Sequence, residues 1–193
     1  LSFFADFTTY SFQAIKHLTT GDGGALICKN DHDFSSAKKL KWFGYDRDIV
    51  KDKKGEWKGQ KWDADIEKNN VGYKFNMNNI SAAIGLAQLK YIDGLIEKNV
   101  RNANVYQNSF KNSNIIKVIE LPKESISSYW VYTCIFKGDK DKRDILLEKL
   151  IEEGIAAGLV HLPNHKYSAF QDFYSDLPGT EEFNNHQISL PCG

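Results

Sequence analysis

The 193-residue sequence has few cysteines and no excess of charge of either sign. Its three cysteines, Cys28, Cys134 and Cys192, lie far apart and lack the short CxxC or CxH spacings of metal sites. This pattern argues against both a disulfide framework and a zinc site, and we expect reduced, mostly buried thiols. Basic and acidic residues both number 25, so no global field attracts nucleic acid or an anionic membrane.

Several other features are absent. No apolar run is long enough to span a bilayer, and the opening residues lack a basic flank and are interrupted by Asp6, so we expect neither a membrane anchor nor a signal peptide. The sequence has no GxSxG elbow, Walker loop or dinucleotide fingerprint, and no internal repeat. These absences favour a cytoplasmic protein outside the common hydrolase and nucleotide-binding classes.

One segment carries the residues of a reactive lysine. Residues 11–24 read SFQAIKHLTTGDGG, with Lys16 in the middle and Ser11 five positions earlier. A lysine amine acts as a nucleophile only when it is unprotonated, and an apolar surrounding favours that form. We expect such a wall from four neighbours: Phe12, Ala14, Ile15 and Leu18. Together with a phosphate donor at Ser11 and a glycine-rich turn, these are the parts that a pyridoxal phosphate site needs.

Three segments in order resemble the DegT/StrS class of sugar-nucleotide aminotransferases. SFxxxK followed by TTGDGG resembles the family's cofactor-lysine segment. Residues 72–80 (GYKFNMNNI), followed by SAAIGLAQL, are similar to its glycine-tyrosine segment and the long helix after it. Gly154-Ile155, residues 161–165 (HLPNH) and residues 187–191 (QISLP) resemble its C-terminal substrate region.

The resemblance implies an α/β fold: the C-terminal part of an aspartate aminotransferase-like, PLP-dependent transferase. Residues 1–90 are then the end of the cofactor-binding large domain, with an active-site loop at 43–71, and residues 91–193 are a small C-terminal α/β domain. Family members carry a long segment before the lysine, with an acidic residue for the pyridine nitrogen and an aromatic for the ring. We therefore expect a C-terminal portion, truncated also after Gly193, that retains cofactor poorly and is inactive by itself.

The activity implied is transamination of a keto group on a nucleotide-linked deoxysugar, with glutamate as amino donor, in surface-polysaccharide synthesis. The enzyme is expected to be a homodimer, because the family's cofactor pocket is shared. Lys16 would hold the cofactor covalently and then move a proton. Two alternatives stay open: a related sugar dehydratase, in which the family has histidine in place of this lysine, and a truncated, catalytically inert α/β fragment.

Other site residues follow from the same resemblance. Ser11 is expected to bind the cofactor phosphate, and Asn76 to contact the phosphate in the neighbouring subunit. Some family members carry that asparagine two positions earlier, where this chain has Lys74, and we favour Asn76. Tyr73 and His161 are assigned to the substrate.

His161 and His165 have the spacing of metal ligands on a helix, but Pro163 between them would break such a helix. We expect no metal site.

The segment 43–71 combines lysines with Trp57 and Trp62, as a single-strand nucleic-acid surface would. Six interspersed acidic residues cancel most of that potential, so we do not expect nucleic-acid binding. A mobile lid over a nucleotide sugar uses the same chemistry and is the interpretation that we prefer.

Periodicity predicts the remaining elements. We expect a strand at 25–29, a helix at 31–42, strands at 115–120 and 129–136, and a helix at 141–153 that ends at Gly154. Helical spacing from residue 80 to 110 predicts one long helix, capped by Asn79, bent at Gly94 and buried on all sides over residues 81–89. After residue 160 the prolines favour turns and short pieces.

Overall fold

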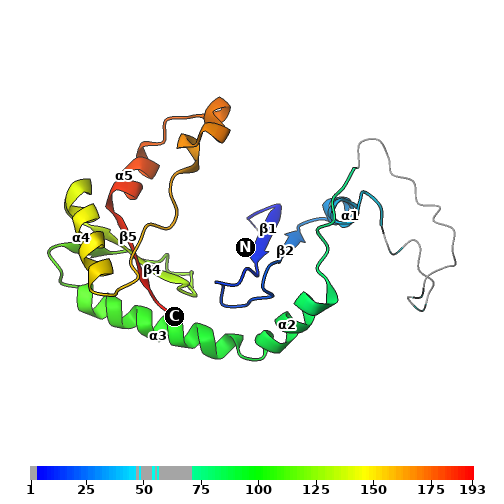
Figure 1. Cartoon of the computed structure of the whole chain (residues 1–193), viewed down its shortest axis with the longest axis horizontal. Coiled ribbons are helices and arrows are strands. Elements are labelled where there is room, and N and C mark those ends of the chain that lie inside the picture. The colour runs from blue at the N-terminus through cyan, green and yellow to red at the C-terminus, as the bar shows by residue number, and fades with distance from the viewer. Residues whose placement is uncertain (1–3, 47, 49–53, 55, 57–70) are drawn as a thin grey trace. The chain divides into compact units, whose positions relative to one another are not determined.

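The computed structural model describes residues 4–46, 48, 54, 56 and 71–193. The fold is α/β, and the chain divides into two compact units, Leu1–Lys90 and Tyr91–Gly193 (Figure 1). The expected active-site loop at 43–71, including Trp57 and Trp62, lies mostly outside the described residues.

The first unit begins with a hairpin of two antiparallel strands, β1 (Phe7–Ser11) and β2 (Gly24–Cys28). Ser11 pairs with Gly24 at the end of the ladder, so the lysine-bearing segment forms the loop between the strands. Helix α1 (Asp31–Leu40) follows at once, because the Asn30 side chain accepts a hydrogen bond from the Asp33 N–H at 2.9 Å and caps its first turn.

The end of α1 is joined to the segment that leads into helix α2 (Asn79–Leu89). The Tyr73 N–H donates to the Leu40 carbonyl at 2.8 Å, and the Phe75 N–H donates to the Lys41 carbonyl at 2.9 Å. The cap of α2 is Asn78 rather than the expected Asn79: the Asn78 Oδ1 accepts from the Ser81 N–H at 2.9 Å. Asn78 and Asn79 have the same side chain, so the sequence does not distinguish them as caps. The cap is Asn78 because its backbone is extended and Asn79 is the first helical residue.

The expected single helix from residue 80 to 110 is two helices, since α3 (Ile92–Phe110) starts after a break at Lys90 and Tyr91. Gly94, the expected bend, lies inside α3. Lys90 and Tyr91 both keep backbone dihedral angles of the right-handed helical region. The helical spacing of the apolar residues therefore continues from one helix into the next.

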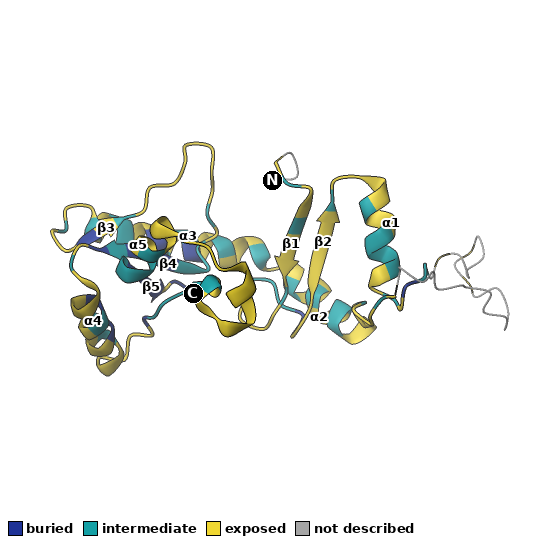
Figure 2. Ribbon diagram, turned by 90° about the horizontal axis from the view of Figure 1, so that it is seen from above, coloured by how far each residue is buried: buried dark blue, intermediate teal, exposed yellow. Residues whose placement is uncertain are grey.

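The expectation that residues 81–89 are buried on all sides is also wrong for the described chain. No residue of α2 is buried, as the helix coloured exposed and intermediate in Figure 2 shows. Ile80, Leu86 and Leu89 are each more than half exposed. The composition correctly indicates an apolar helix, but burial on all sides requires a covering surface all round, and the described residues cover the helix only in part.

The second unit contains a three-stranded antiparallel sheet in the order β3 (Ile116–Val118), β4 (Val131–Phe136), β5 (Gln187–Pro191). Around it lie α3, α4 (Lys140–Glu152), two short 3₁₀ turns at Asn164–Lys166 and Ser168–Phe173, and α5 (Pro178–His186). Most of the tail after residue 160 was expected to form turns and short pieces. Instead it supplies a helix and a strand, because β5 is stabilised by its partner β4 rather than by local propensity.

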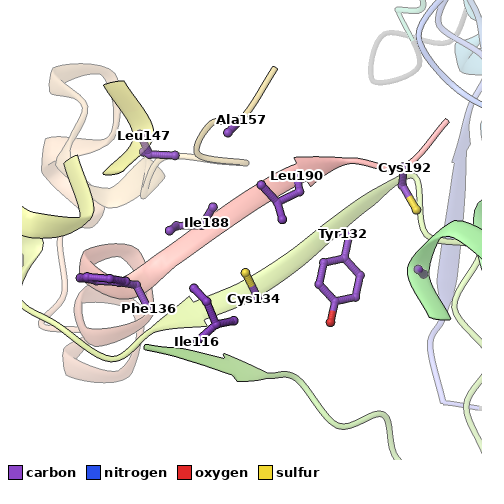
Figure 3. Packing of buried hydrophobic residues seen from close by; sticks show 10 residues of the cluster. Ile116, Tyr132, Cys134, Phe136, Leu147, Ala157, Ile188, Leu190 and Cys192 are labelled. Atoms are coloured by element: carbon purple, nitrogen blue, oxygen red, sulfur yellow. The ribbon is translucent and has the colours of Figure 1, made fainter. Parts of the chain in front are cut away.

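The core lies on this sheet. Tyr132, Cys134 and Phe136 alternate along β4 and pack with Ile188 and Leu190 of β5 (Figure 3). Burial raises the pKa of the Cys134 thiol to about 11, and all three cysteines are free.

Caps define the ends of α4. The Asp139 side chain accepts from the Lys142 N–H at 2.9 Å, and Gly154, with φ of 78°, ends the helix as expected. None of the helices in the described part of the chain is long and apolar enough to cross a membrane.

Candidate functional site

The Lys16 loop, residues 12–23, is closed at its base by backbone hydrogen bonds. The Phe12 N–H donates to the Gly23 carbonyl, and the Thr20 N–H donates to the Phe12 carbonyl, both at 2.9 Å. These bonds continue the β1–β2 ladder beyond Ser11 and Gly24, so the loop starts from a fixed platform.

Threonine side chains organise the return of this loop. Thr19 Oγ1 donates to the Phe12 carbonyl at 3.3 Å and accepts from the Gly21 N–H at 3.0 Å. Thr20 Oγ1 donates to the Asp22 carbonyl at 2.8 Å. Gly21 and Gly23 have φ of 82° and 141°, a region that residues with a β-carbon rarely adopt. The TTGDGG sequence therefore builds a tight turn with internally satisfied polar groups.

Lys16 lies in a turn on the outward part of the loop, where its N–H donates to the Gln13 carbonyl at 2.9 Å. Its side chain is half-buried. The expected apolar wall is only partly present: Phe12 and Leu18 are half-buried, whereas Ala14 and Ile15 are exposed, Ile15 by 61%. An irregular turn does not keep consecutive apolar residues on one side, which is why the expectation failed for those two residues.

Ser11 is exposed at the end of β1. Its Oγ accepts a long hydrogen bond, 3.4 Å, from the Gln13 N–H. Because the oxygen acts as the acceptor there, the hydroxyl hydrogen remains able to donate to an anion.

The residues of the loop fit pyridoxal phosphate in two respects. A neutral donor, Ser11, stands at the base of the loop, and a half-buried amine, Lys16, stands within it. Gly24 adds a close backbone approach, because a β-carbon there would lie 2.6 Å from the Tyr10 carbonyl oxygen. Within the described residues, the structure gathers no three histidine, cysteine, aspartate or glutamate side chains that could hold a metal ion.

The segment after Gly72 carries the remaining predicted residues of the first unit. The Asn76 Oδ1 atom is buried and has no hydrogen-bond partner among the described residues, while the Asn76 amide nitrogen donates to the Met77 carbonyl at a long 3.4 Å. The Lys74 amine lies 5.4 Å from the centre of the Trp42 ring, a cation–π distance. The Tyr73 ring stacks on Phe75 at 5.1 Å and is largely exposed.

His161 belongs to the second unit, where it is exposed and stacks on Trp130 with 6.2 Å between ring centroids. It lines a cavity of about 570 Å³ formed by the segment 159–167 and by α5 with the start of β5. His165 has a different environment: its Nε2 lies 3.0 Å from Glu181, which also binds Lys166. The Lys166 ammonium is the main cause that lowers the pKa of the Glu181 carboxyl.

Sequence reasoning missed two residues of the same cavity, Asn184 and Gln187. Both lie in the tail after residue 160, most of which was expected to form turns and short pieces. The alternation of QISLP was the signal for a strand beginning at Gln187, in which Gln187 and Ser189 share the face opposite to Ile188 and Leu190.

The structure thus places Lys16 in the loop of a hairpin and the glycine-tyrosine segment directly before helix α2 of an α/β chain. The family model for the DegT/DnrJ/EryC1/StrS aminotransferase family matches residues 2–193, and the chain belongs to this family.

Curated relatives include a UDP-4-amino-4,6-dideoxy-N-acetyl-beta-L-altrosamine transaminase from Helicobacter pylori, which is 30% identical over 98% of this chain and 48% of its own. A GDP-perosamine synthase from Escherichia coli O157:H7 is 30% identical over 97% of this chain and 47% of its own. The chain therefore spans about half the length of the curated relatives it matches.

Solved structures give the same result. The sugar aminotransferase CalS13 from Micromonospora echinospora matches 97% of this chain and 47% of its own, with a TM-score of 0.82 and 27% identity. A Streptococcus pneumoniae protein, 26% identical, has been solved in PLP and PMP forms, with TM-scores of 0.78 and 0.79 over 97% of this chain and 47% and 46% of its own.

Proposed function

We propose that this chain is part of a PLP-dependent aminotransferase that converts a keto group on a nucleotide-linked deoxysugar to an amine, with glutamate as amino donor. The observation that carries the proposal is the Lys16 loop. The loop holds a half-buried lysine and is closed by the β1–β2 hairpin. Ser11, the last residue of β1, is exposed at its base. Family membership and the PLP and PMP forms of a similar protein support the choice of cofactor.

In this proposal Lys16 has two roles. Its amine binds the cofactor aldehyde covalently at rest, and the released Nζ later carries a proton to and from the reacting carbon. When bound, pyridoxal phosphate supplies the electron sink that amino-group exchange requires.

Phosphate binding is assigned to Ser11 and Asn76. Ser11 donates its hydroxyl hydrogen, and the Asn76 amide is only weakly engaged by Met77. Lys74 is a poorer candidate because its ammonium already lies over the Trp42 ring. Tyr73 and His161 are assigned to the substrate, which is supported by their exposure and, for His161, by the adjoining cavity.

The proposal includes a domain assignment and a homodimer. The first unit would be the end of the cofactor-binding large domain, and the second the small C-terminal domain. The apolar, exposed surface of α2 supports an interface, since Ile80, Leu86 and Leu89 would otherwise face water.

The test is covalent trapping of the cofactor. The chain is incubated with saturating pyridoxal phosphate, reduced with borohydride and digested, and the modified peptide is mapped by mass spectrometry. We expect modification at Lys16, its loss in Lys16→Ala, and its retention in the control Lys29→Ala, a half-exposed lysine just after the same hairpin.

We also expect the unreduced cofactor to be lost on dialysis. Absence of the near-ultraviolet band at saturation, or modification spread over other lysines, would favour an inert fragment.

A further inference from the structure

Met77, the only methionine of the 193-residue sequence, lies where two segments of the first unit meet. One segment is the β1–β2 hairpin with Ser11, and the other carries Asn76 and leads into α2. The methyl group of Met77 packs against the hairpin loop at Gly23, because a β-carbon added to Gly23 would lie 3.1 Å from Met77 Cε. The two residues assigned to the cofactor phosphate are therefore on segments that contact each other through Met77.

Gly23 stands at the base of the Lys16 loop. Its carbonyl oxygen accepts, at 2.9 Å, one of the backbone hydrogen bonds that close the loop. The next residue, Gly24, pairs with Ser11 at the end of the ladder. Gly23 has a φ of 141° and no β-carbon, which allows the close approach of the methyl group. Met77 thus contacts the loop at the end where Ser11 lies.

Thr20 makes the loop side of this contact rigid. Its Oγ1 atom would lie 2.9 Å from the same added β-carbon of Gly23, and it donates to the Asp22 carbonyl at 2.8 Å. Thr20 is 4% exposed, and its methyl group faces Gly85 of α2. The Met77 methyl group therefore packs on a fixed part of the loop.

Asn76 is linked to Met77 on the other side of the contact. The Asn76 Nδ2 atom donates to the Met77 carbonyl at 3.4 Å, and the residue after Met77, Asn78, caps α2. The main chain of Met77 is therefore held between the Asn76 amide and the start of the helix. Its side chain then determines where that amide lies relative to the hairpin.

We propose that Met77 is a positioning residue for phosphate binding. Its contact with Gly23 holds the Asn76 segment against the hairpin and keeps the Ser11 end of the loop in place. The inference rests on the proposed function for the identity of the ligand. It goes beyond that function by assigning a role to a thioether side chain, which has no hydrogen-bond donor to offer the phosphate itself.

The test compares pyridoxal phosphate with pyridoxal, which has the same aldehyde but no phosphate. The Lys16 amine condenses with either aldehyde and releases water, and borohydride then reduces the product to a stable secondary amine that mass spectrometry maps. Met77→Ala should raise the concentration of pyridoxal phosphate that half-saturates modification of Lys16 by about tenfold, which corresponds to one weakened hydrogen bond. Modification of Lys16 by pyridoxal should stay at the parent level, because no phosphate is bound.

Two further variants control for the loss of the side chain. Met77→Leu keeps an apolar side chain of similar volume and should retain the parent value for pyridoxal phosphate. Val71→Ala shortens an apolar residue of the same segment that is 68% exposed, and it should leave both aldehydes at the parent values. Met77 itself is 37% exposed, so its truncation opens no closed cavity and the variant is expected to fold.

A purely structural role of Met77 would impair modification by both aldehydes alike, and that result would overturn the inference. An unchanged half-saturation with pyridoxal phosphate would overturn it as well. If neither aldehyde modifies Lys16 in the parent chain, the proposed function fails, and amide hydrogen exchange without cofactor then decides the inference. Met77→Ala should raise exchange in residues 12–23, and exchange equal to that of the parent chain would overturn the role of the contact.

Discussion

Thr20 and Gly85 pack so closely that a β-carbon added to Gly85 would lie 2.7 Å from the Thr20 Cγ2 methyl carbon. Thr20 is 4% exposed, and its hydroxyl is bound to the Asp22 carbonyl, so it cannot rotate away without losing that bond. Helix α2 thereby supports the return of the Lys16 loop. Gly85 is required because a larger residue would clash with Thr20, and not because the helix needs a glycine at this position.

Gly85→Ala should therefore loosen the loop. Alanine favours a helix by about 1 kcal/mol over glycine, but overpacking typically costs about 1–3 kcal/mol, so we expect a net loss of stability. Amide hydrogen exchange should rise in residues 12–23.

The matched control is Gly94→Ala in α3, where an added β-carbon meets nothing within 4 Å and stabilisation is expected. Equal exchange of the loop in both variants would contradict the role of the Thr20 contact.

Gly72→Ala should be more damaging than Gly85→Ala. A β-carbon at Gly72 would lie 2.4 Å from the Gly44 nitrogen and 2.5 Å from the Leu40 carbonyl oxygen, and backbone atoms cannot rotate aside. The bonds that tie Tyr73 and Phe75 to the end of α1 should break. The midpoint of thermal unfolding should be lower for Gly72→Ala than for Gly85→Ala. A midpoint for Gly72→Ala equal to that of the parent chain would contradict the close contact of Gly72 with Gly44 and Leu40.

Local sequence patterns predicted the elements that local chemistry determines. The strand at β2, the helix α1 and the stop of α4 at Gly154 depend on caps, turns and periodicity that neighbouring residues supply. Strand β5 was missed although QISLP alternates, because the segment is short and its stability comes from pairing with β4, more than fifty residues earlier in the chain.

The same difference between local and long-range interactions applies to the candidate site. Ser11, Lys16 and the glycine turn were predicted as site residues because one short segment contains them all, whereas Asn184 and Gln187 come to line their cavity only through the packing of α5 and β5 near residues 159–167. The unpaired oxygen of Asn76 is likewise a property of packing and has no signature in the sequence.

Arg143→Met should strongly destabilise the second unit. The guanidinium also binds Asp144 through Nε at 2.7 Å, and its loss leaves two main-chain carbonyls unpaired inside the protein. Hydrogen bonds from charged groups contribute about 1.5–3 kcal/mol, so we expect a loss of about 2–4 kcal/mol in urea unfolding.

Arg101→Met is the control for Arg143→Met. Arg101 lies on the surface of α3, 3.9 Å from Glu97, and should change stability by less than about 0.5 kcal/mol. Similar losses in both variants would count against the buried role of Arg143.

The three thiols should react at different rates. Cys28 is half-buried in the first unit, whereas Cys134 and Cys192 are buried in the second, with exposures of 0% and 2%. Iodoacetamide should modify Cys28 first and reach the other two only as the second unit opens, because burial excludes the reagent and raises their pKa values. Mass spectrometry over time gives the order, and Cys28→Ser should remove only the fast phase. Labelling of Cys134 as fast as Cys28 would contradict the burial of Cys134 in the core of the second unit.

Acid should release the contact that Glu181 makes with Lys166 and His165. The pKa of the Glu181 carboxyl is lowered from 4.5 in the folded state, chiefly by its hydrogen bond with Lys166. A lowered pKa means that the stabilisation is fully present above the unfolded value and is lost as the pH falls through the folded value. Glu181→Gln should therefore lower the free energy of unfolding at pH 7, and the difference from the parent chain should shrink toward zero below about pH 4. Glu182→Gln is the matched control, since Glu182 is largely exposed and its carboxylate lies 3.5 Å from His186 Nδ1. A difference between parent and Glu181→Gln that is the same at both pH values would show that the contact is steric rather than ionic.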